Sequence, residues 1–126
     1  MSTGMKHILL VDDERGLRQL LLTTLAAPDF AIAQASSGEQ ALQLARELQP
    51  DLIILDMHLT PEHPNGIEVC RQLKTDPATA AGRVLMLTAA RRPEDRRAAE
   101  QAGADFYFTK PFSPRQLLDQ IYALLG

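Results

Sequence analysis

The stretch DLIILD, residues 51–56, decides the fold. Four consecutive branched apolar residues between two carboxylates are typical of a short strand buried on both faces, as in the centre of a parallel sheet. Asp56 is then the first residue to leave the sheet. Because open parallel sheets bind ligands beyond the carboxyl ends of their strands, Asp56 stands at the edge where chemistry is expected.

Length and composition favour one globular domain spanning residues 1–126. Hydrophobic residues make up 45% of the chain, and a formal net charge of −3 offers no broad basic surface for a nucleic-acid backbone. No apolar run approaches the roughly 20 residues that span a bilayer, and no signal-peptide pattern is present, so we expect no membrane contact and a cytoplasmic location. The only cysteine, Cys70, excludes an internal disulfide and is expected to be a buried helix residue.

Five strand-then-helix units follow one another along the chain. The predicted strands are 6–11, 30–35, 51–56, 83–88 and 106–109. The second of these alternates only weakly and is expected near an edge of the sheet. Such a succession predicts an α/β sandwich with right-handed crossovers and helices on both faces of a parallel sheet.

The helices are predicted from capping residues and from apolar spacing. Helix starts are indicated by Ser37 with Gln40, Asn65 with Glu68, and Ser113 with Pro114, while Asp12 or Asp13 could cap the first helix and Gly103 suits a left-handed helix end. The helix from Pro93 to about Ala102 has only alanines on its core face. The other expected apolar faces are Leu17, Leu20, Leu21 and Leu25; Ala41, Leu42, Ala45 and Leu48; Ile67, Cys70 and Leu73; and Leu117, Ile121, Leu124 and Leu125.

Four of the predicted strands end in polar residues, namely Asp12 with Asp13, Asp56, Thr88 and Lys110. These side chains converge if the strands are parallel, because all strand ends then lie at one edge. Three carboxylates within a few ångströms repel one another, which requires raised pKa values or a bound cation, and hard oxygen ligands favour Mg²⁺. A carboxylate beside Mg²⁺ can attack a phosphoryl group. Asp56 is the best-placed nucleophile, with Lys110 and Thr88 facing the phosphoryl oxygens.

Four motifs, in this order and spacing, resemble the receiver domain of two-component response regulators: VDDE at 11–14, LIILD at 52–56, LTA at 87–89 and TKPF at 109–112. The resemblance covers essentially the whole chain. It implies a flavodoxin-like three-layer sandwich, with five helices and a five-stranded parallel sheet in the order 2-1-3-4-5. It also implies a signalling switch rather than an enzyme. Such a switch takes a phosphoryl group from a histidine kinase or histidine phosphotransfer protein with Mg²⁺, and signals through the surface of its last two strands and helices.

Roles at the acidic edge follow from the resemblance position by position. Asp56 matches the phosphoacceptor and also a metal ligand. Asp12 and Asp13 match the acidic pair around Mg²⁺, with Asp13 the direct ligand. His58 matches the position whose backbone carbonyl also binds the metal.

Other roles concern the last two strands. Thr88 and Lys110 match the phosphoryl-sensing hydroxyl and ammonium. Tyr107 matches the aromatic residue that turns inward when Thr88 moves, although plain packing is the other interpretation of this tyrosine. Lys110–Pro111 matches a bond that is usually cis.

The chain departs from the family pattern at two places. The loop from Asp56 to Gly66 contains two prolines and is longer than usual, so we expect the approach to the site to differ, and we hypothesise that the His58 side chain affects the lifetime of the phosphoryl group. Asp105 and Arg115 resemble charged positions used in dimers of winged-helix regulators. Residue 120, however, is a glutamine where that subfamily usually has an arginine. We therefore expect a monomer or a weak phosphorylation-dependent dimer.

Three alternatives stay open at this point. A phosphoaspartyl hydrolase of the haloacid dehalogenase type would also use Asp and Mg²⁺, but it needs an Asp-x-Asp motif that residues 12–14 lack. A phosphorylation-independent binding module would be indicated by loss of a site residue, and none is lost. The four arginines between 91 and 97 are either a solvated helix face or a surface for a downstream partner.

Overall fold

Five parallel strands form one sheet in the order β2-β1-β3-β4-β5, and five helices connect or follow them. The computed structural model describes residues 5–27, 29–59 and 65–125. The strands are β1 Lys6–Val11, β2 Phe30–Ala35, β3 Leu52–Leu55, β4 Arg83–Thr88 and β5 Phe106–Thr109. The helices are α1 Arg15–Thr24, α2 Gly38–Leu48, α3 Gly66–Thr75, α4 Pro93–Gln101 and α5 Pro114–Leu125. The predicted strand order and the predicted edge position of β2 are confirmed.

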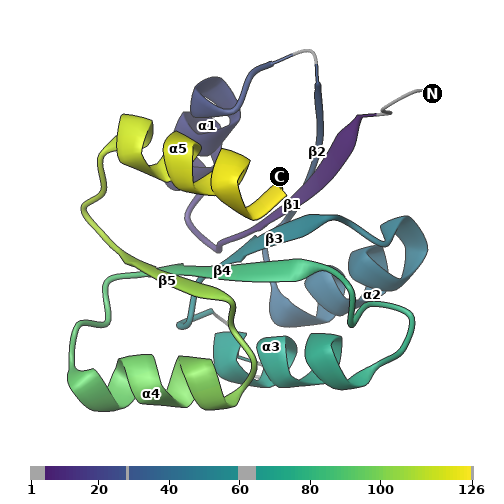
Figure 1. Ribbon diagram of the computed structural model, residues 1–126, viewed down its shortest axis with the longest axis vertical. Coiled ribbons are helices and arrows are strands. Elements are labelled where there is room, and N and C mark those ends of the chain that lie inside the picture. The colour runs from purple at the N-terminus through teal and green to yellow at the C-terminus, as the bar shows by residue number, and fades with distance from the viewer. Residues whose placement is uncertain (1–4, 28, 60–64, 126) are drawn as a thin grey trace.

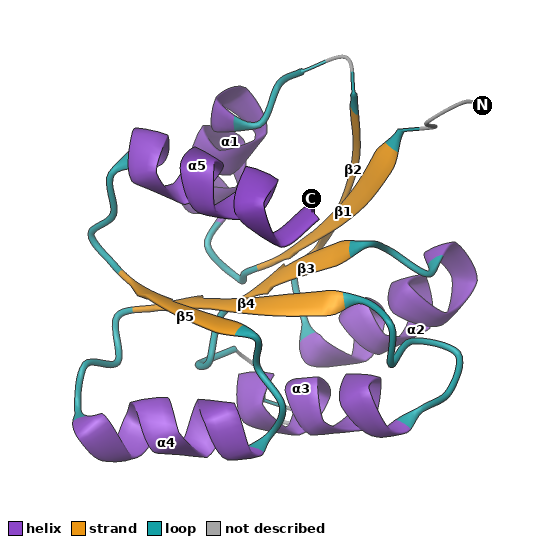
Figure 2. Cartoon of the chain, in the orientation of Figure 1, coloured by secondary structure: helices purple, strands orange, loops and turns teal. Residues whose placement is uncertain are grey.

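The sheet separates two layers of helices (Figures 1 and 2). Helices α1 and α5 cover one face, and α2, α3 and α4 cover the other. Leu21 and Ile121 pack on the first face, and Leu42, Val69 and Ala99 on the second. The three-layer sandwich inferred from the strand-then-helix succession is therefore confirmed.

Strand β3 is the buried centre of the sheet. Its four residues are at most 2% exposed, because β1 and β4 flank it and helices cover both of its faces. Residues that alternate along it belong to the two different cores, with Ile53 on one side and Ile54 on the other. The flanking carboxylates Asp51 and Asp56 lie just outside the strand, so the apolar run delivers Asp56 to the carboxyl edge.

Side-chain caps open three of the helices as predicted. The Ser37 hydroxyl accepts a hydrogen bond from the Gln40 amide, and the Asn65 side chain does the same for Glu68. Ser113 likewise accepts from the amide three residues later. The prediction for α1 was wrong, because its N-cap is residue 14 and no side-chain cap is present there.

Two leucines expected on buried faces lie in solvent instead. Leu20 on α1 is 46% exposed and Leu48 at the end of α2 is 43% exposed. In each helix the buried stripe is narrower than the apolar spacing suggested, since contact with a flat sheet covers only part of a helix surface. Cys70 is fully buried as expected, and burial raises the pKa of its thiol to about 11.

Gly103 ends α4 with a φ of +104°, in the left-handed region that the sequence predicted. A Cβ at this position would lie 2.8 Å from the Lys74 side chain, so both the backbone angle and the close packing favour glycine. Within the described residues, none of the helices is long and apolar enough to cross a membrane. The two prolines of the predicted long loop, Pro61 and Pro64, lie outside the described residues.

Candidate functional site at the carboxyl edge of the sheet

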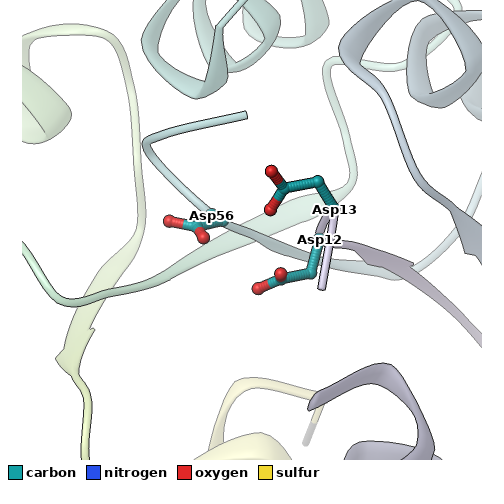
Figure 3. Close-up of side chains that lie close together, drawn as sticks. All are labelled: Asp12, Asp13 and Asp56. Carbon is teal, nitrogen blue, oxygen red and sulfur yellow. The ribbon is translucent and has the colours of Figure 1, made fainter. Parts of the chain in front are cut away.

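The carboxyl ends of β1 and β3 bring three carboxylates together. Oxygen atoms of Asp12, Asp13 and Asp56 lie within 4.8 Å of one another, and Figure 3 shows the three side chains grouped at the ends of their strands. Asp12 is 3% and Asp56 is 8% exposed, whereas Asp13 is exposed to solvent. The convergence predicted from the strand ends is therefore present in the structure.

Lys110 extends from the end of β5 into this group. Its Nζ donates to Asp12 Oδ2 at 3.0 Å and to Asp56 Oδ2 at 3.1 Å. Burial opposes the charge on the ammonium, but the neighbouring carboxylates Asp56 and Asp12 outweigh burial and raise the pKa of Lys110. Burial is also the main reason that the pKa of Asp12 is raised. The four groups together carry three carboxylates against one ammonium.

Backbone amides hold the two buried carboxylates in place. Asp12 Oδ1 accepts from the Glu14 amide at 2.8 Å, which explains why this carboxylate does not cap α1. Asp56 Oδ1 accepts from the His58 amide at 3.2 Å. Arg18 of α1 donates to the Asp12 carbonyl at 2.6 Å. Hydrogen bonds thus hold the side chains of both Asp12 and Asp56 and also the backbone of Asp12.

Gly66, at the start of α3, packs closely against the backbone of Asp56, and the sequence did not predict this contact. A Cβ on this residue would lie 2.0 Å from the Asp56 carbonyl oxygen and 2.6 Å from Met57 Cα, far inside van der Waals contact. The Gly66 amide also donates to the Met57 carbonyl at 3.0 Å. The chain therefore returns from the loop directly against the backbone that carries Asp56, and only glycine leaves room for that approach.

Thr88 and Tyr107 lie on the neighbouring strands β4 and β5. Thr88 is fully buried, and its hydroxyl accepts from the Ala90 amide at 3.3 Å. Tyr107 is only 7% exposed, so its ring is turned inward, and its hydroxyl donates to the Ala90 carbonyl at 2.5 Å. One short segment after β4 therefore contacts both residues. The Lys110–Pro111 bond is cis, as the resemblance implied.

The His58 side chain is exposed, at the end of the described part of the loop after β3. The metal ligand predicted at this position is the backbone carbonyl of His58. Its role stays a prediction, as do the roles of the other site residues.

Two of the four arginines near α4 pair with acidic side chains close by in the sequence. Arg92 pairs with Glu94 and Asp95, and Arg96 pairs with Glu100. These contacts favour the solvated-face interpretation over a basic docking surface. Arg91 is different, because it donates to the Lys110 carbonyl at 2.5 Å.

The Asp105 carboxylate is engaged within the molecule. It accepts from the Val84 amide at 2.8 Å and pairs with Lys74 at 2.9 Å and Arg83 at 3.6 Å. Burial opposes ionisation, but Lys74 and the amide lower the pKa of Asp105. In a dimer, a contact made by this carboxylate would therefore compete with the Lys74, Arg83 and Val84 contacts that join α3, β4 and the start of β5.

The donor set fits a hard divalent cation. The three grouped carboxylates offer only oxygen atoms, and ions such as Mg²⁺ bind through one or two carboxylates while keeping several waters. Among the described residues this is the one acidic or histidine-containing group with that spacing. The exposed side of Asp13 gives a cation access from solvent.

Comparisons with known proteins point to one family. The family model described as the response regulator receiver domain matches residues 8–122. The transcriptional regulatory protein ResD of Bacillus subtilis is 40% identical over 98% of this chain and 50% of its own length, and the DNA-binding response regulator MtrA of Mycobacterium tuberculosis is 39% identical over 99% and 53%. The chain thus spans about half the length of these relatives.

Solved structures agree with the sequence matches. A putative response regulator from Chloroflexus aurantiacus has a TM-score of 0.88 at 31% identity, covering 96% of this chain and 98% of its own. The chemotaxis protein CheY4 of Vibrio cholerae also has a TM-score of 0.88, at 29% identity, covering 97% and 100%.

Proposed function

The chain belongs to the response regulator receiver domain family, and from this premise we propose that Asp56 accepts a phosphoryl group from a phosphohistidine donor and that the whole chain, 1–126, acts as one phosphorylation-dependent switch. The observation that carries the proposal is the convergence of three carboxylates and the Lys110 ammonium at one edge of the sheet. Hydrolysis of a separate substrate is not part of the proposal.

Asp56 is the nucleophile in this scheme. As a carboxylate oxygen of Asp56 forms the new P–O bond, the P–N bond to the donor imidazole breaks and the nitrogen keeps the electron pair. The His58 amide and the Lys110 ammonium contact different oxygens of the carboxylate, which fixes the plane of the group before transfer. Strand β3, which precedes Asp56, is buried and therefore holds the nucleophile in a fixed position at the edge of the sheet.

Asp12, Asp13, Asp56 and the His58 backbone carbonyl would hold Mg²⁺. When bound, this ion neutralises the attacking carboxylate and the incoming phosphoryl oxygens. The chain itself supplies the second positive charge, because Lys110 lies between the two buried carboxylates and can turn to the phosphoryl oxygens. Its raised pKa keeps the ammonium protonated at neutral pH.

Thr88 and Tyr107 are the parts that carry the change outward. The Thr88 hydroxyl, now accepting from Ala90, can donate to a phosphoryl oxygen, and the Ala90 segment and Tyr107 then move with it. Hydrogen bonds to charged groups contribute about 1.5–3 kcal/mol each, and about 5.5 kcal/mol shifts a two-state equilibrium from 1:99 to 99:1. Two or three new contacts to one phosphoryl group are therefore sufficient to shift the equilibrium between two conformations, which differ at the surface formed by β4, β5, α4 and α5.

Partners follow from the family and from the relatives. A histidine kinase or histidine phosphotransfer protein is the proposed donor. The two sequence relatives named above are transcriptional or DNA-binding regulators about twice as long as this chain, and a downstream protein or a fused output domain is proposed to receive the signal. This segment carries a net charge of −3 and is not proposed to contact nucleic acid itself. A cytoplasmic location and a monomer or weak phosphorylation-dependent dimer stay predictions.

Intact mass measurement after incubation with acetyl phosphate and Mg²⁺ tests the proposal. Wild type should gain one phosphoryl adduct, and D56N should gain none. D51N is the matched control, since Asp51 flanks the opposite end of β3 and should leave the adduct intact. Failure of folded wild type to form the adduct would favour a phosphorylation-independent binding module. Rapid turnover of a phosphomonoester would favour a hydrolase.

A further inference from the structure

Arg91 lies between β4 and α4, three residues after Thr88, and sequence analysis gave it no role at the site. Its Nη2 donates to the backbone carbonyl of Lys110, with an N–O distance of 2.5 Å, although 19 residues separate the two positions in the sequence. The ammonium of the same lysine contacts Asp12 and Asp56. Arg91 is thus hydrogen-bonded to the backbone of the residue whose ammonium contacts both buried carboxylates.

The segment that carries Arg91 is joined to β5 at further points. The Tyr107 hydroxyl donates to the Ala90 carbonyl at 2.5 Å, and the Lys110 amide donates to the Thr88 carbonyl at 2.9 Å. Of these three cross-connections, the one from Arg91 is supplied by a charged side chain and is the most exposed to water. It is therefore the connection that a substitution can remove without opening the core.

We propose that Arg91 is a positioning residue for phosphoryl transfer. By holding the Lys110 carbonyl, it fixes the direction in which the Lys110 side chain leaves β5 and keeps residues 89–91 over the buried Thr88. This inference rests on the function proposed above. Because Arg91 donates to a backbone carbonyl, its loss should slow transfer to Asp56 while leaving the affinity for Mg²⁺ near that of wild type.

The test compares R91Q, R91K and R97Q with wild type. The rate constant for phosphorylation by acetyl phosphate, measured at saturating Mg²⁺, should fall about three- to tenfold in R91Q, as expected for the loss of one solvent-accessible hydrogen bond. R91K keeps the charge and one donor and should recover part of the rate. R97Q removes the same charge from the exposed face of α4 and should stay within about twofold of wild type. Mg²⁺ titration calorimetry checks that affinity is unchanged.

Hydrogen exchange provides a second measurement that does not need phosphorylation. Amides of residues 88–92 should exchange faster in R91Q than in R97Q, while urea unfolding gives the two variants similar free energies. Equal rates of phosphorylation and exchange in R91Q and wild type would overturn the proposal, as would equal slowing by R91Q and R97Q, which would indicate bulk charge alone. If R91Q fails to fold, the comparison of R91K with R97Q decides.

The two proposals fail in distinguishable ways. Absence of the adduct in wild type would contradict the assigned function of Asp56. In that case unchanged exchange of residues 88–92 in R91Q would contradict the positioning role as well, and faster exchange would support the connection from Arg91 to Lys110.

Discussion

Replacing Lys110 by methionine tests the electrostatics of the acidic edge directly. Methionine keeps most of the apolar stem and removes the ammonium that bonds Asp12 and Asp56 at 3.0 and 3.1 Å. Two hydrogen bonds between charged groups contribute about 3–6 kcal/mol together. The variant no longer has to bury an ammonium, which offsets part of this loss, so K110M should lower the free energy of unfolding by about 2–4 kcal/mol at pH 8 without Mg²⁺.

The pH dependence of this loss has a definite sign. In wild type the pKa of Lys110 is raised, so its contribution is complete below the ordinary lysine value and is lost only as pH rises through the folded value. In K110M the pKa of Asp12, already raised by burial, rises further, and protonation then relieves the unpaired charge. The deficit should therefore shrink as pH falls from 8 toward the ordinary carboxylate value of about 4.

Urea unfolding followed by circular dichroism at several pH values measures the difference in free energy of unfolding between K110M and wild type. K6M is the control, because Lys6 is exposed at the start of β1 and its loss should cost less than about 0.5 kcal/mol. Millimolar Mg²⁺ should reduce the K110M deficit by supplying the missing positive charge. A deficit below about 1 kcal/mol at pH 8, or one that grows on acidification, would refute the electrostatic account of the site.

Four further substitutions follow from the geometry. G66A should destabilise the fold by several kcal/mol, on the order of 3 or more, and abolish the adduct, because its Cβ would collide with the Asp56 carbonyl; normal urea stability would contradict this. Y107F removes the hydrogen bond to the Ala90 carbonyl and should lower the free energy of unfolding by about 1 kcal/mol. Its phosphorylation rate should stay near that of wild type, while amide hydrogen exchange in the segment after β4 should become faster. H58N should alter the dephosphorylation rate between pH 6 and 8, since the His58 side chain is exposed two residues after Asp56; an unchanged rate across this range would contradict the hypothesis. D105N should cost about 1–3 kcal/mol at pH 7, and urea curves should show the cost disappearing as pH falls through the lowered pKa of Asp105.

The strand-end rule explains how much of the site the sequence could predict. A recognisable apolar run precedes each of Asp12, Asp56, Thr88 and Lys110. A parallel sheet brings such positions to one edge independently of the paths of the loops. The sheet order needed the family resemblance, because apolar spacing identifies strands but does not specify which strands are neighbours.

Other contacts depend on loop paths that local sequence does not encode. Gly66 looked like an ordinary turn residue, and its contact with Asp56 arises only because the chain folds back against β3. Arg91 was one of several arginines on a polar helix start, and nothing in its neighbours indicated a bond to a residue 19 positions away. Leu20 and Leu48 were misplaced because periodicity gives the direction of an apolar stripe and leaves its width undetermined.

Cys70 has a practical consequence for studying the switch. Its thiol is fully buried against the Ala102 carbonyl, and burial raises its pKa to about 11, so only about one molecule in ten thousand carries a thiolate there at pH 7. The native protein is therefore nearly inert to maleimide and iodoacetamide reagents. A cysteine introduced at exposed Tyr122 would be labelled selectively in the otherwise natural sequence, which allows a spin label or fluorophore to follow movement of α5 in real time.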